Sequence, residues 1–153
     1  MTPLPVERET VLVRLNGIEG ELVELQNLSK IPFQEFADGV GFKLSQYHLH
    51  RALEGVFHII AHILSRVPGG HEGGGYKDLA RLFGEKGFIE RSFAKKNLVS
   101  IAGYRNRLVH FYAEISPKEI FKLLHENLGD VETFLKAVKA ILQNPEKFGL
   151  TVR

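Results

Sequence analysis

The chain has 153 residues and a formal net charge of +2, with 44% apolar and 25% charged residues. This balance is typical of one globular domain with its own hydrophobic core, and it excludes a disordered chain. The sequence contains no cysteine, which excludes disulfides, zinc–thiolate sites, iron–sulfur clusters and cysteine nucleophiles. It also lacks a signal-peptide pattern and any apolar run near the roughly 20 residues of a membrane span. We therefore expect a single domain over residues 1–153 that is cytoplasmic and has no membrane contact.

Apolar residues that recur at three- and four-residue steps predict a first helix over residues 5–28, which the sequence SKIP at 29–32 ends. A loop that contains Asp38, Gly39 and Gly41 is expected next. The second helix is predicted over residues 44–66. The glycine-rich stretch PGGHEGGG at 68–75 terminates it.

The second half of the chain predicts a short helix over 76–85 and long helices over 90–111 and 117–142. The last helix begins at SPKE, residues 116–119, where serine can cap, proline takes the first helical position and glutamate can complete a capping box. No stretch predicts a β-strand. Four long helices with short connections predict an all-α, antiparallel up-and-down four-helix bundle with one additional short helix.

Two histidines on the second helix have the spacing of metal ligands. His58 and His62 are one helical turn apart, and Glu54 lies one turn earlier. However, the sequence HIIAH lacks the glutamate that follows the first histidine in a metalloprotease motif, and no third ligand is evident. We expect ordinary, partly buried histidines and neither a metal ion nor another cofactor.

Positive charge is concentrated between residues 76 and 107, which contain eight basic and three acidic residues. Such a segment can attract a polyanion, and Lys95, Lys96 and Arg107 are its candidate RNA-binding residues. A solvated helix face is the commoner meaning of such a run.

The stretch YRNRLVHFYAEI, residues 104–115, places polar side chains where a helix should present apolar ones. At about 100° per residue, Arg105 and Tyr112 fall on the apolar stripe, and Asn106 and His110 lie on the adjacent stripe. Arg107 is expected to point outward. An arginine beside a histidine that titrates near neutrality is suited to binding a phosphate. The alternative is structural, because basic residues in a last helical turn face the negative end of the helix dipole, and a tyrosine on a bundle seam packs.

Residues 105–112, RNRLVHFY, resemble the R-N-x-x-x-H-x-Y signature of HepT-like toxins in the HEPN superfamily. The likeness extends to the order of three segments, YHLHRALEGVFHIIAHIL at 47–64, YKDLARLFGEKGFI at 76–89 and LVSIAGYRNRLVHFY at 98–112. It implies an HEPN-like helical bundle that forms a homodimer with the two motifs in one cleft. It further implies a type II toxin that cleaves RNA without a metal and that pairs with a minimal nucleotidyltransferase antitoxin.

The resemblance assigns roles to four residues. Arg105 would hold the phosphate, His110 would act as base or acid, and Asn106 would orient the phosphate or His110. Tyr112 would be the residue that the antitoxin modifies with AMP. Two alternatives remain open, a non-catalytic nucleotide- or RNA-binding subunit of a nucleotidyltransferase complex and a helical scaffold without a site.

Overall fold

The computed structural model describes residues 4–70, 74–110 and 115–153. The described residues form eight α-helices, a π-helical turn η1 and a 3₁₀ turn η2. Their bounds are α1 Arg8–Leu28, α2 Phe33–Asp38, α3 Val40–Leu64, α4 Tyr76–Glu85, α5 Arg91–Phe93, η1 Ala94–Leu98, α6 Val99–Val109, α7 Pro117–Glu126, α8 Leu128–Gln143 and η2 Pro145–Phe148. Extended pairing in these ranges is limited to a single parallel bridge between Val6 and Val152.

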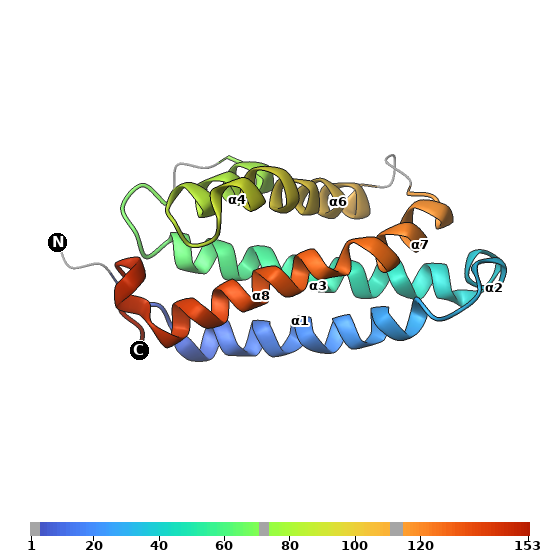
Figure 1. Cartoon of the computed structure of the whole chain (residues 1–153), viewed down its shortest axis with the longest axis horizontal. Helices are drawn as coiled ribbons and strands as arrows, with labels where there is room; N and C mark the ends of the chain where they lie inside the picture. The colour runs from blue at the N-terminus through green and yellow to red at the C-terminus, as the bar shows by residue number, and fades with distance from the viewer. Residues whose placement is uncertain (1–3, 71–73, 111–114) are drawn as a thin grey trace.

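The helices alternate in direction as the bundle prediction requires (Figure 1). α1 and α3 are antiparallel neighbours, the α4–α6 segment lies beside α3, and α7 with α8 returns diagonally from α3 to α1. At the contact between α1 and α3, a Cβ atom added to Gly55 would lie 2.7 Å from Cγ1 of Ile18. The predicted all-α up-and-down bundle is therefore confirmed, and the glycine allows its two longest helices to approach closely.

The apolar stripe of α1 is buried where the sequence pattern places it. Its buried residues are Val11, Leu15, Ile18, Leu22 and Leu25. None of the helices in the described ranges is long and apolar enough to cross a membrane.

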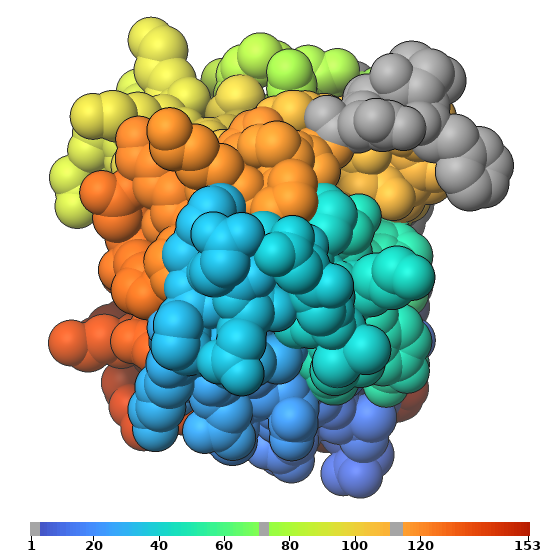
Figure 2. All heavy atoms as spheres, turned by 90° about the vertical axis from the view of Figure 1, so that its right-hand side faces the viewer, coloured from blue at the N-terminus to red at the C-terminus, as the bar shows by residue number. Residues whose placement is uncertain are grey.

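The loop expected before the second long helix is partly helical. α3 begins at Val40, four residues before the predicted start, and α2 is a helix of six residues that the periodicity did not reveal. Figure 2 shows α2 at the end of the bundle beside α7. Phe36 of α2 is fully buried there, with its ring centroid 5.1 Å from that of Phe121 on α7.

The helix predicted over 90–111 is present over Arg91–Val109, with two differences from the prediction. A π-helical turn interrupts the segment at Ala94–Leu98, and the helix ends at Val109. The π-helical turn packs closely against α4: a Cβ atom added to Gly84 of α4 would lie only 2.4 Å from the Cβ atom of Ala94. Residue 111, the last of the predicted helix, lies outside the described residues.

The last predicted helix is also divided, since α7 ends at Glu126 and α8 starts at Leu128. Asn127 between them has non-helical dihedral angles, φ −121° and ψ −4°. The start of α7 is as predicted: Pro117 occupies the first turn, and the Ser116 hydroxyl accepts a hydrogen bond from the backbone N–H of Glu119 at 3.1 Å. The Glu119 carboxylate binds another residue, described below.

Candidate functional site

Arg105 on α6 points toward α3, where it meets a carboxylate. Its Nε donates a hydrogen bond to Oε1 of Glu54 at 2.5 Å, and the two side chains are only 21% and 22% exposed. A part-buried charge needs such a partner, because removing it from water is costly. The arginine that interrupts the apolar stripe of α6 is therefore matched by an acid on the facing helix.

An aromatic ring supports the same guanidinium. Cζ of Arg105 lies 4.0 Å from the ring centroid of Tyr76, the first residue of α4. This ring stacks in turn on Phe57 of α3, with centroids 4.9 Å apart and planes at 7°. Cation–π contact and stacking restrict the guanidinium to one plane.

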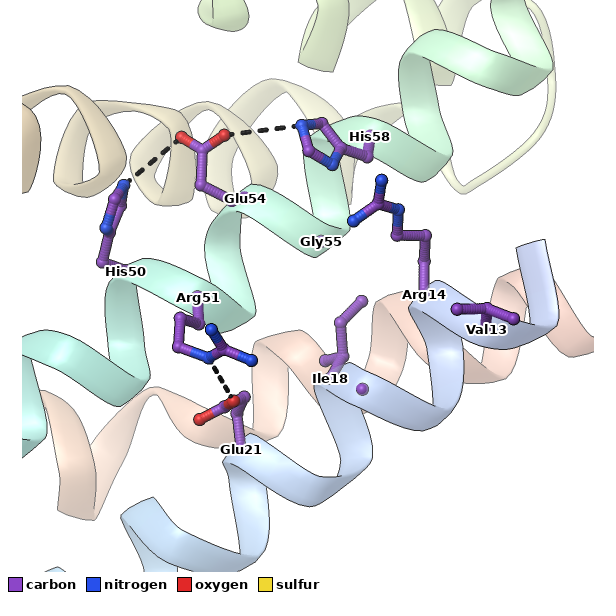
Figure 3. Close-up of a pocket in the computed structure, with 10 residues that line it drawn as sticks. Val13, Arg14, Ile18, Glu21, His50, Arg51, Glu54, Gly55 and His58 are labelled. Atoms are coloured by element: carbon purple, nitrogen blue, oxygen red, sulfur yellow. Dashed lines mark hydrogen bonds and ion pairs between the residues drawn. The ribbon is translucent and has the colours of Figure 1, made fainter. Parts of the chain in front are cut away.

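Two histidines flank Glu54 on α3, one turn to either side (Figure 3). Nε2 of His50 lies 3.6 Å from Oε1 of Glu54, and Nε2 of His58 lies 3.6 Å from Oε2. Both rings are nearly half exposed, at 44% and 45%. Glu54 thus joins Arg105 to two groups that can carry protons at the surface.

Asn106 contacts the arginine next to it, and His110 lies beyond the end of the helix. Oδ1 of Asn106 accepts a hydrogen bond from Nη1 of Arg105 at 3.3 Å. The backbone of His110 is extended, with φ −99° and ψ 119°, and its N–H reaches the Asn106 carbonyl at 3.3 Å. This bond is the helical one between a residue and the fourth before it, so His110 is the C-cap of α6 and lies one turn from Asn106. His110 remains close to Arg105 in the chain and is exposed.

Arg107 was expected to point outward, but it forms an ion pair across the bundle with Glu119 of α7. Its Nη2 donates to Oε1 of Glu119 at 3.0 Å, and Nη1 donates to the other carboxylate oxygen. The Arg107 guanidinium keeps the pKa of Glu119 below its usual value. Burial, and then the Glu119 carboxylate, raise the pKa of Tyr104. This pair fastens the end of α6 to α7.

The other candidate RNA-binding residues, Lys95 and Lys96, lie in the π-helical turn and are exposed. Lys96 lines a shallow pocket of about 350 Å³ together with Lys77, Tyr104 and Arg107. Three elements, α4, η1 and α6, therefore bring basic residues to this part of the surface. Tyr112 lies outside the described residues.

The two histidines with metal-ligand spacing have separate roles. Nε2 of His62 accepts the backbone N–H of Glu7 at 3.0 Å, whereas His58 faces Glu54. Burial, and then Arg66, lower the pKa of His62. Among the residues that the structure describes, no group of three or more His, Asp or Glu side chains is arranged to hold a metal ion.

Sequence reasoning placed Glu54 only beside His58 and did not identify Tyr76 or Glu54 as partners of Arg105. The missed signal is the arginine itself, because an arginine on an apolar stripe requires an acid on a facing helix. Glu54 lies with His50 and His58 on the less buried stripe of α3. The sequence pattern does not show that Arg105 and Glu54 meet across 51 residues of sequence.

Comparison with known proteins agrees with this architecture. Residues 18–138 match the family model described as "HepT-like: Ribonuclease HepT-like". A comparison with curated protein sequences finds no match.

Solved structures share the fold. A toxin–antitoxin structure with AMP-PNP aligns with a TM-score of 0.74 at 20% identity, covering 87% of this chain and 99% of the other. A tri-AMPylated Shewanella oneidensis HEPN toxin in complex with MNT antitoxin aligns with a TM-score of 0.72 at 20% identity, covering 87% and 98%. Since the family model spans most of the sequence, the chain belongs to the HepT-like ribonuclease family.

Proposed function

We propose that the protein is the toxin of a type II toxin–antitoxin pair and a metal-independent endoribonuclease. The observation that carries this proposal is the constrained Arg105 guanidinium, held by Glu54 and Tyr76 five residues before His110. A planar cation in a fixed orientation suits the recognition of a phosphate. Membership of the ribonuclease HepT-like family and the fold shared with HEPN toxins support the same assignment.

In this reaction the RNA supplies its own nucleophile. A general base removes the proton of a 2′-hydroxyl, the 2′-oxygen attacks the adjacent phosphorus, and the bond from phosphorus to the 5′-oxygen breaks. A general acid protonates the departing 5′-oxygen, which leaves a 2′,3′-cyclic phosphate and a 5′-hydroxyl. Arg105 stabilises the charge on the non-bridging oxygens, and His110 carries one of the two protons. Asn106 supports Arg105 through its 3.3 Å contact.

A homodimer would supply the second proton carrier as a second copy of His110. An exposed apolar stripe on α3 supports such a contact. Val40, Leu44 and Tyr47 are 69%, 42% and 55% exposed and lie on one face of the helix. The same face continues to Glu54, so a twofold contact there would bring two Arg105 sites toward one cleft.

The antitoxin would be a minimal nucleotidyltransferase, as in the complex of the AMPylated HEPN toxin with MNT antitoxin. We propose Tyr112 as the residue that receives AMP. Each added phosphate would compete with RNA for Arg105. Lys95, Lys96 and Arg107 are proposed as weaker contacts to the RNA backbone.

The test is cleavage of a fluorescent single-stranded RNA by purified protein in excess EDTA. The wild type should cut and leave cyclic phosphate ends, while His110→Ala should not cut yet should elute at the same size. Equal rates for the two proteins would overturn the role of His110. Loss of cleavage in EDTA that zinc restores would overturn metal independence. RNA binding without any cleavage would favour the non-catalytic subunit.

A further inference from the structure

A pocket of about 370 Å³ opens between α1 and α3, beside Glu54 (Figure 3). Its apolar lining comes from Val13 and Ile18. Gly17 and Gly55 also line it, and because they have no side chains they leave the pocket open. This volume falls in the usual range for small-ligand sites. A second hollow of about 380 Å³ lies along the same two helices and shares lining residues with it, so the depression is a groove.

The polar rim of the pocket carries one cation without a carboxylate partner in the described ranges, Arg14. In Figure 3 its guanidinium points from α1 toward His58 on α3. The other arginine of the rim, Arg51, is held by Glu21 at 2.7 Å. Arg14 is therefore the rim group best placed to bind an anion from solution.

Glu54 connects this pocket to Arg105. The carboxylate lines the pocket and also accepts the hydrogen bond from Arg105 Nε. His50 and His58 line the pocket and contact the same carboxylate. A chain of nucleotides with one phosphate at Arg105 could therefore place a neighbouring nucleotide in the pocket.

We propose that this pocket binds one nucleotide of a single-stranded RNA whose scissile phosphate lies at Arg105. Its phosphate would pair with Arg14, while the ribose and base would cover the apolar lining of Val13, Ile18 and the glycines. The combination of one available cation with an apolar floor fits a nucleotide better than it fits a purely ionic ligand. This inference rests on the proposed ribonuclease function and adds a substrate subsite to it.

Gly17 provides a selective way to fill the pocket. A Cβ atom added there meets no atom within 4 Å, and the same is true of Gly20, less than one turn further along α1. Of these two glycines, Gly17 is the one that lines the pocket. Glutamine at either position keeps the net charge and favours a helix more than glycine does. Gly17→Gln should therefore obstruct the pocket without unfolding α1, and Gly20→Gln is its matched control.

Binding is measured by fluorescence anisotropy of a labelled single-stranded RNA in a His110→Ala background, where no cleavage interferes. We expect Gly17→Gln and Arg14→Gln to weaken binding at least fivefold and Gly20→Gln to bind like its parent. Loss of one phosphate contact should also reduce the slope of log K against log salt by about 0.7 in Arg14→Gln. In proteins with intact His110, Gly17→Gln should raise KM for cleavage, and neither glycine variant should melt below the wild type.

Several outcomes would overturn the proposal. Equal RNA affinity of Gly17→Gln and Gly20→Gln removes the subsite but leaves ribonuclease activity intact, so the proposed function would survive. A change of oligomeric state by light scattering in Gly17→Gln alone would assign the groove to a protein interface. If the wild type neither binds nor cuts RNA, both proposals are wrong.

Discussion

Replacing Glu54 tests whether the carboxylate positions Arg105 or merely neutralises it. Glu54→Ala removes the acceptor of the 2.5 Å hydrogen bond, while the ring of Tyr76 remains against the guanidinium. Glu54→Gln keeps an oxygen acceptor and removes the charge. If Glu54 positions Arg105, alanine should reduce kcat and glutamine should restore much of it. If Glu54 restrains the charge of Arg105, both variants should cut RNA faster.

The magnitude follows from the burial of the pair. Both side chains are about four-fifths buried, so the hydrogen bond is in the range for charged groups, about 1.5–3 kcal/mol. Full loss of this orientation in the transition state would lower kcat about 10- to 150-fold. Folding should lose less, about 1 kcal/mol, because water can reach the guanidinium once the acid is gone. A protein of this length would then melt roughly 2–4 °C lower.

The assay is steady-state cleavage of a fluorescent RNA together with thermal unfolding. We expect kcat to fall in Glu54→Ala while KM does not rise, since removing a negative charge cannot weaken attraction of an anion. Glu19→Ala is the matched control, because it breaks an ion pair with Lys139 at 3.1 Å on another side of α1. Unchanged or increased kcat in Glu54→Ala would refute the positioning role.

Three further predictions concern other residues. Arg105→Lys should cut RNA at least tenfold more slowly than the wild type, because a point charge lacks the planar grip on a phosphate; equal rates would contradict this. Tyr112→Phe should still cut RNA but gain no mass from a nucleotidyltransferase and ATP in intact-mass spectrometry; an equal gain in both proteins would contradict the assignment. The lowered pKa of His62 means that the unfolded chain binds a proton first, so the free energy of unfolding should fall as pH drops below about 6.5. Protonation would also break the hydrogen bond that the Glu7 N–H donates to His62. In His62→Gln the melting temperature should therefore change less between pH 7 and 5 than it does in the wild type.

The sequence predicted the structure best where burial depends on the apolar face of a single helix. The three- and four-residue spacing of apolar residues over 5–28 predicted one buried stripe, and α1 buries Val11, Leu15 and Ile18 on that stripe. The start of α7 was equally predictable, because the Ser116 cap and Pro117 act through local chemistry.

The missed elements depend on contacts between distant segments. Nothing local marks the π-helical turn at Ala94–Leu98, which packs closely on Gly84. Helix α2 is too short for periodicity to reveal, and its single buried side chain, Phe36, gains its environment from α7. The ion pair of Arg107 with Glu119 similarly joins two helices, so the outward direction expected for Arg107 was wrong.

The position of Arg105 changes how the two interpretations of its sequence motif relate to each other. From the sequence, an arginine on an apolar stripe is either a structural residue or a phosphate ligand, and these two interpretations are alternatives. In the structure its burial depends on Glu54 and on the face of Tyr76. These same contacts hold the guanidinium in one orientation, which is what a phosphate ligand requires. The packing that makes a part-buried charge tolerable in this bundle is therefore also the source of its preorganisation.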